Sequence, residues 1–140
     1  MKKLFLDTDV VMDYLTDRLP FSESITKVIH LTRDKKAELY VSPISFPNLF
    51  YIMKKERSRS QIISSFKELA KYVSITEVGK KHIMKSFDSD FSDYEDAVQY
   101  SSAEEIKNVS AILTRNKKDF SESDIAVMTP DEYVKAMNVE

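Results

Sequence analysis

Carboxylate side chains gather in three segments of this 140-residue chain. The first holds Asp7, directly after a short apolar run near the start of the chain. The second is DSDFSDYED (88–96), which ends in Asp96, and the third is TRNKKDF (114–120), which contains Asp119. Carboxylate oxygens are hard ligands, and hard ligands select Mg²⁺ or Mn²⁺ over zinc. The pattern predicts a divalent metal site with Asp7, Asp96 and Asp119 as ligands.

The composition excludes several other kinds of catalytic site. Cysteine is absent, which removes thiolate zinc sites and thiol nucleophiles. The two histidines, His30 and His82, lie far apart in the sequence, and the one glycine, Gly79, is too few for a glycine-rich phosphate loop. A cation held by carboxylates binds phosphate oxygens and lowers the pKa of water, which favours phosphodiester hydrolysis. The net charge of −2 leaves the class of substrate open.

Short apolar runs alternate with helical patterns, which predicts an α/β fold with a mostly parallel central sheet. The expected strands are 3–6, 38–42, 72–76, 109–114 and 125–128. The helices expected between and after them lie over 10–15, from 22, from 45, after 60, around 82 and over 93–105, with a closing helix after the capping box Thr129–Glu132. No linker or repeat interrupts this pattern, so we expect a single domain over residues 1–140.

The expected elements bring the three acidic segments toward one edge of the sheet. Ligands of parallel α/β sheets bind beyond the carboxyl ends of the strands, where Asp7 and Asp119 are expected to lie. Asp96 is expected to reach this edge from its helix. Asp93 and Asp96 are three residues apart and are predicted to share a helix face, with Glu95 directed elsewhere.

Four segments in this order resemble the PIN domain family, over residues 3–133. They are LFLDTDVVMDYL, SPISFPNLFYI, DFSDYEDAVQYSSA and LTRNKKDF, followed by a closing VMTPDEY. The resemblance is to the bacterial branch of VapC-like toxin ribonucleases. It implies a three-layer α/β/α sandwich, Mg²⁺- or Mn²⁺-dependent cleavage of RNA, a homodimer and an antitoxin partner.

The resemblance also assigns roles to individual residues. Asp7 matches the acid after the first strand and Asp96 the acid of the late helix. Asn116 and Asp119 match the polar pair after the fourth strand, one or both of which supports the metal. Thr8 matches the small hydroxyl residue beside the first acid.

One position departs from the family pattern. Many PIN domains carry a glutamate where this chain has Asn48. An amide supplies no charge and is a poor general base, so weaker metal binding is expected. Asp93 is predicted to compensate for the missing carboxylate. Arg115 and Lys117 are predicted to contact RNA phosphates beside the site.

Two alternative functions follow from the same residues. Because of Asn48, the chain also fits a catalytically weak or inactive PIN-like module that binds RNA or protein. Asp7 and Asp9 form an Asp-x-Asp pair that resembles haloacid-dehalogenase-like phosphatases, although the glycine-rich continuation of that motif is missing. In the simplest structural interpretation, Asp7 or Asp9 caps the next helix, and Asp9 is well placed to do so.

The chain carries no recognisable targeting segment. The apolar run before Asp7 is shorter than the core of a signal peptide, and no segment reaches membrane-spanning length. The sequence therefore predicts a cytoplasmic protein without membrane contact.

Overall fold

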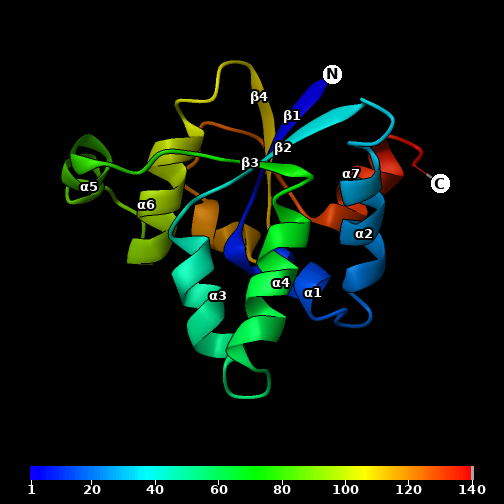
Figure 1. Ribbon diagram of the computed structural model, residues 1–140. Coiled ribbons are helices and arrows are strands. Elements are labelled where there is room, and N and C mark those ends of the chain that lie inside the picture. The colour runs from blue at the N-terminus through cyan, green and yellow to red at the C-terminus, as the bar shows by residue number, and fades with distance from the viewer. Residues whose placement is uncertain (140) are drawn as a thin grey trace.

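The computed structural model describes residues 1–139, and its strands and helices alternate along the chain (Figure 1). The strands are β1 (Lys2–Leu6), β2 (Ala37–Val41), β3 (Val73–Ile75), β4 (Val109–Leu113) and β5 (Val127–Met128). The helices are α1 (Thr8–Leu15), α2 (Ser22–His30), α3 (Ser45–Met53), α4 (Arg59–Leu69), α5 (Lys80–Ser86), α6 (Tyr94–Ala103), the 3₁₀ helix η1 (Lys117–Phe120) and α7 (Pro130–Ala136).

The five strands form one sheet in the order β3-β2-β1-β4-β5, and every pair in it is parallel. The predicted parallel sheet is confirmed. Strand β1 lies at the centre, with β2 on one side and β4 on the other. The chain runs outward from β1 through β2 to β3 and then crosses to β4 on the other side of β1. The carboxyl ends of β1 and β4 therefore form a topological switch point, where ligands of such sheets bind.

Helices cover both faces of the sheet, which confirms the three-layer α/β/α architecture. Successive residues of a strand point to opposite faces. In β1, Leu4 and Leu6 therefore pack into a large core with α1, α2, α3, α4 and α7. Phe5 points to the other face, where it packs in a smaller cluster with Tyr100 of α6 and Phe120 of η1.

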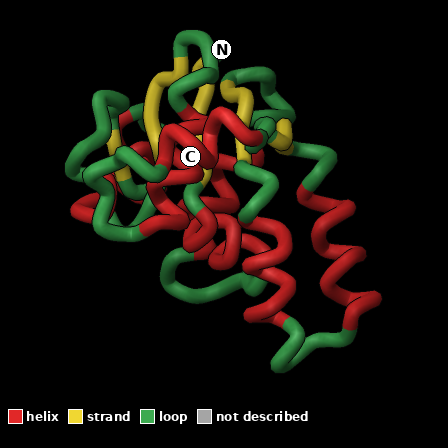
Figure 2. Tube along the Cα trace, turned by 90° about the vertical axis from the view of Figure 1, so that its left-hand side faces the viewer, coloured by secondary structure: helices red, strands yellow, loops and turns green. Residues whose placement is uncertain are grey.

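Helices α3 and α4 form a hairpin that extends beyond the carboxyl end of the sheet (Figures 1 and 2). Phe46 of α3 and Phe66 of α4 pack edge to face between the two helices, with ring centroids 5.2 Å apart. Helix α4 begins with a capping box formed by Ser58 and Gln61. The predicted capping box at Thr129 is confirmed as the start of α7. Within residues 1–139, no helix is long and apolar enough to cross a membrane.

Candidate active site

Asp7 lies at the carboxyl end of β1 and is the most constrained acid of the switch point. Its Oδ1 accepts hydrogen bonds from the backbone N–H of Thr8 at 2.7 Å and from Nε2 of Gln99 at 2.9 Å. Its Oδ2 accepts a bond from the hydroxyl of Thr114 at 2.7 Å. These donors come from α1, α6 and the end of β4. The carboxylate is 5% exposed, and burial raises its pKa.

Asp9 connects the first turn of α1 to the loop that follows β4. Its Oδ2 accepts hydrogen bonds from the backbone N–H of Arg115 at 3.0 Å and from Nδ2 of Asn116 at 3.2 Å. Of the two acids expected to cap α1, Asp7 occupies the N-cap position and Asp9 does not. Burial and the negative charge of Asp7 raise the pKa of Asp9 to about 7.

The structure brings the three acids predicted to bind metal to the same end of the sheet. Asp96, in the first turn of α6, is 8% exposed. Its pKa is raised to about 8 by burial and by four negative charges, those of Asp7, Asp93, Asp119 and Glu95. Carboxylates that raise each other's pKa in this way lack a compensating cation. Asp119 lies in η1 and contributes to this effect from the β4 side.

The two acids that precede Asp96 in the sequence, Asp93 and Glu95, take positions different from those predicted. Asp93 does not share a helix face with Asp96, because it is the N-cap of α6 and accepts the backbone N–H of Asp96 at 3.2 Å. Glu95 is directed into the site, where its Oε1 accepts the hydroxyl of Thr8 at 2.8 Å. The reason is that α6 is buried on all sides from Asp96 to Ala103. Such a helix has no single inward face, so the position of Glu95 did not follow from helical spacing.

A chain of hydroxyl groups connects α3 to Glu95. The hydroxyls of Ser45 and Thr8 lie 2.6 Å apart. Because Thr8 donates its proton to Glu95, Ser45 donates to Thr8. Asn48 follows Ser45 by one helical turn and is half-buried. Within residues 1–139, the side-chain amide of Asn48 makes no hydrogen bond.

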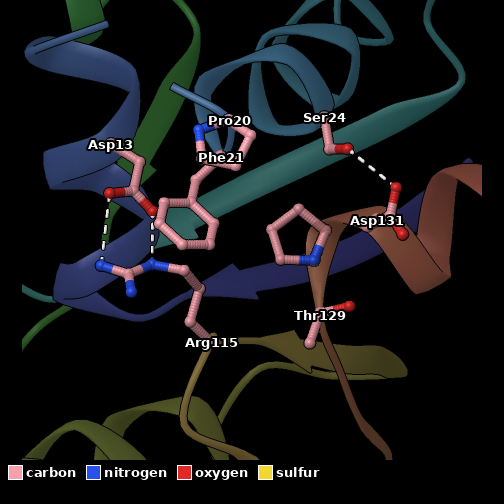
Figure 3. A pocket seen from close by; sticks show the side chains of 8 residues that line it. Asp13, Pro20, Phe21, Ser24, Arg115, Thr129 and Asp131 are labelled. Atoms are coloured by element: carbon pink, nitrogen blue, oxygen red, sulfur yellow. Dashed lines mark hydrogen bonds and ion pairs between the residues drawn. The ribbon is translucent and has the colours of Figure 1, made fainter. Parts of the chain in front are cut away.

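The two cations predicted to contact RNA are engaged by other acids. Arg115 donates from Nε to Asp13 at 2.6 Å and from an Nη at 3.3 Å, and its guanidinium stacks on Phe21 at 4.2 Å (Figure 3). Lys117 forms an ion pair with Glu132 at 3.0 Å. Arg115 faces a cavity of about 600 Å³ that is lined in addition by Pro20, Ser24, Thr129, Pro130 and Asp131. Contact of either side chain with RNA stays a prediction.

The electrostatics and hydrogen bonding of the site fit a hard cation. In the described part of the chain, six acids of this site form no ion pair; these are Asp7, Asp9, Asp93, Glu95, Asp96 and Asp119. Two buried acceptors, Oδ1 of Asp9 and Oε1 of Gln99, have no hydrogen-bond partner. Oxygen atoms of this kind are the ligands that Mg²⁺ and Mn²⁺ prefer. Among residues 1–139, however, no three acidic or histidine side chains lie close enough together to enclose an ion.

Three residues of this site were not among the predicted site residues, namely Asp9, Glu95 and Gln99. One signal for them was present in the sequence. Gln99 follows Glu95 by four residues and Asp96 by three, so a helix places its amide beside both carboxylates. Nε2 of Gln99 does lie 3.4 Å from Glu95 and 3.5 Å from Asp96.

Comparison with known proteins identifies a family match and similar solved structures. The family model described as PIN domain matches residues 3–118, which include every predicted site residue except Asp119. A chain of VapBC2 from Rickettsia felis, solved with a promoter DNA fragment, is 17% identical, with a TM-score of 0.66, over 90% of this chain and 96% of that chain. A chain of a toxin–antitoxin complex from Klebsiella pneumoniae is 18% identical, with a TM-score of 0.67, over 91% of this chain and 97% of that chain.

A third similar structure is VapC20 from Mycobacterium tuberculosis, which is described as a toxin that cleaves the sarcin–ricin loop. It is 11% identical, with a TM-score of 0.59, over 78% of this chain and 86% of that chain. No curated protein sequence matches this chain. At these identities the structural likenesses establish a common fold.

Proposed function

The chain belongs to the PIN domain family, and we propose that it is an Mg²⁺- or Mn²⁺-dependent ribonuclease that hydrolyses phosphodiester bonds. The observation that carries this proposal is the group of six carboxylates at the switch point, none of which has a cationic partner in the described chain. Two of the six, Asp7 and Asp96, are buried. A carboxylate without a cationic partner is costly to bury, and a bound cation would remove that cost.

Asp7, Asp96 and Asp119 would hold the cation, and Asp9 and Asn116 would support them. When bound there, the cation would supply Lewis acidity toward the phosphodiester and lower the pKa of a water molecule. Three hydrogen bonds hold the two carboxylate oxygens of Asp7 in one orientation, which suits this side chain to bind the cation. Asp96 holds a proton near neutral pH and must release it when a cation binds, since its pKa is about 8.

The similar structures support a more specific proposal about biological role. Chains of the VapBC2 complex and of the Klebsiella complex come from toxin–antitoxin pairs, and VapC20 is a toxin that cleaves the sarcin–ricin loop. We propose that this chain is the toxin of such a pair, that an antitoxin protein binds it, and that it forms a homodimer.

Calorimetric titration with Mn²⁺, together with an RNA cleavage assay, tests the proposed activity. Wild type is expected to bind Mn²⁺ and to cut RNA only in its presence, whereas Asp96→Asn is expected to do neither. Asp34→Asn is the matched control, because it removes an exposed carboxylate from the loop before β2, at the opposite end of the sheet. Metal-dependent cleavage by Asp96→Asn would contradict the assignment of Asp96.

A module that binds RNA or protein without cutting it is the second candidate function. Two observations favour this alternative. Asn48 stands in place of a carboxylate, and among residues 1–139 no three acidic or histidine side chains lie close enough together to enclose an ion. Binding of RNA by wild type without metal and without cleavage, in both Mg²⁺ and Mn²⁺, would support it over the ribonuclease.

A further inference from the structure

The tip of the α3–α4 hairpin, residues 54–59, is basic on a chain that is acidic overall. It contains one acid, Glu56, and four cations, which are Lys54, Lys55, Arg57 and Arg59. Four cations against one acid give the tip a formal charge of +3, whereas the whole chain has a formal charge of −2. Positive charge concentrated in this way attracts polyanions.

The charges of the hairpin tip are available to a ligand. Within residues 1–139, none of the four cations forms an ion pair, whereas Arg115 and Lys117 beside the site are both paired with acids. Three of the four are exposed. The fourth, Arg57, is half-buried and donates from an Nη to the backbone carbonyl of Leu15 at 3.1 Å, which holds the tip against the end of α1.

The hairpin tip lies beyond the same end of the sheet as the candidate active site. Helix α3 begins at Ser45, whose hydroxyl lies 2.6 Å from that of Thr8 in the site. From there its nine residues lead away from the sheet to the tip (Figures 1 and 2). A helix of this length rises about 13 Å. An RNA strand with a phosphate in the site would therefore reach the tip within a few nucleotides.

One exposed face of α3 connects the site with the hairpin tip. Asn48, Tyr51 and Lys55 follow one another at intervals of three and four residues, which places their side chains on one side of the helix. Tyr51 is 64% exposed, and Nζ of Lys54 lies 4.7 Å from the centroid of its ring. An exposed aromatic ring next to cations suits an unpaired base and the phosphates on either side of it.

We propose that this face of α3 and the hairpin tip bind single-stranded RNA next to the phosphodiester that is cut. Tyr51 stacks on a base, and the cations of the tip contact phosphates and position the strand. The inference rests on the proposed action on RNA. The strand is single because the bases of a duplex are stacked on one another and closed to an aromatic side chain.

The test compares two double variants that remove the same charges from opposite ends of the sheet. Lys54→Gln/Lys55→Gln alters the hairpin tip. Its matched control, Lys35→Gln/Lys36→Gln, alters two exposed lysines of the loop before β2. Fluorescence anisotropy measures the binding of a labelled oligouridine of about 16 nucleotides over a range of salt concentrations, with a chelator to prevent metal-dependent cleavage.

We expect Lys54→Gln/Lys55→Gln to bind the oligouridine at least about tenfold more weakly than wild type at low salt. The plot of log affinity against log salt concentration should become shallower by about 1.4, because each lost phosphate contact of a single strand contributes about 0.7. The control should retain the affinity and the salt dependence of wild type. Circular dichroism checks that both variants are folded.

A second pair of variants tests the aromatic ring. Tyr51→Ala should weaken binding about tenfold without changing the salt dependence, because stacking on a base is not an ionic contact. Tyr51→Phe keeps the ring and should bind as wild type does. Wild-type affinity in Tyr51→Ala would overturn the stacking role of Tyr51.

The outcomes separate this surface from the proposed function. Wild-type RNA affinity in Lys54→Gln/Lys55→Gln, or an equal loss in the control, would overturn the surface; the first result is expected if the hairpin tip binds a protein instead. If wild type binds the oligouridine but does not cut RNA in Mn²⁺, the ribonuclease proposal fails and the surface stands. If wild type cuts RNA and the tip variant keeps its affinity, the function stands and the surface falls.

Discussion

Asp96→Asn should make the metal-free protein more stable at pH 8, although it alters a buried residue of the site. The pKa of Asp96 is raised from 3.8 to about 8 by burial and by the surrounding carboxylates. A group whose pKa is higher in the folded state costs stability when it ionises, so the metal-free wild type should lose stability as the pH rises from about 4 to 8. Asparagine has a similar shape and no charge, and it avoids this loss.

The magnitude follows from the two pKa values. At about 1.4 kcal/mol for each tenfold change in ionisation constant, the ionised Asp96 would cost at most about 5 kcal/mol at pH 8. Solvent reaches part of the site and screens the charges there. We therefore expect Asp96→Asn to raise the free energy of unfolding by about 1–2 kcal/mol at pH 8.

Urea unfolding with a chelator present, at pH 5 and at pH 8, measures this effect. The advantage of Asp96→Asn over wild type should be larger at pH 8 than at pH 5, and saturating Mn²⁺ should reverse it by stabilising wild type alone. Asp34→Asn, the exposed control, should stay within about 0.5 kcal/mol of wild type at both pH values. A variant that is less stable than wild type at pH 8, or an advantage that does not change with pH, would refute the reasoning.

Three further predictions concern other parts of the molecule. Arg115→Met leaves the carboxylate of Asp13 buried without its partner and should lower the free energy of unfolding by about 3 kcal/mol in urea titrations, whereas a loss below about 1 kcal/mol would mean that the pair contributes little. Mn²⁺ affinity should increase from pH 6 to 8, because Asp9 and Asp96, with pKa values of about 7 and 8, must release their protons when the cation binds. Calorimetry over this pH range measures the effect, and a constant affinity would mean that these two acids are not ligands. Phe120→Ala removes a ring that is 1% exposed and should cost about 3–4 kcal/mol, measured as a lower urea midpoint, unless the sheet face and α6 collapse into the space.

Much of the fold could be predicted because its signals are local. The alternation of short apolar runs with helical patterns defined the strands and helices to within a few residues. Thr129 and Glu132 stand three residues apart and form the capping box that starts α7. The place of Asp7 after a buried strand was equally local, and a parallel sheet then positions that acid at the carboxyl edge.

The rest of the site depends on contacts between residues far apart in the sequence. Thr8 and Glu95 are separated by 87 positions, and Asp9 contacts the backbone of Arg115 across 106 positions. Helical spacing predicts which side chains of one helix share a face, and that reasoning needs one face in contact with the core. Helix α6 is buried on all sides, so only its packing between the sheet and α5 decided that Glu95 reaches the site.

The amino-acid sequence by itself determined which chemistry the chain can perform, since its carboxylates and its lack of cysteine limit the site to hard cations. It also determined the order of strands and helices, because apolar periodicity is a property of neighbouring residues. The tertiary structure alone decided which acids meet, which cations are already engaged elsewhere, and that α6 contributes two of the carboxylates. The physical reason is that the charges of these groups interact through space, at distances set by the packing of the sheet and its helices.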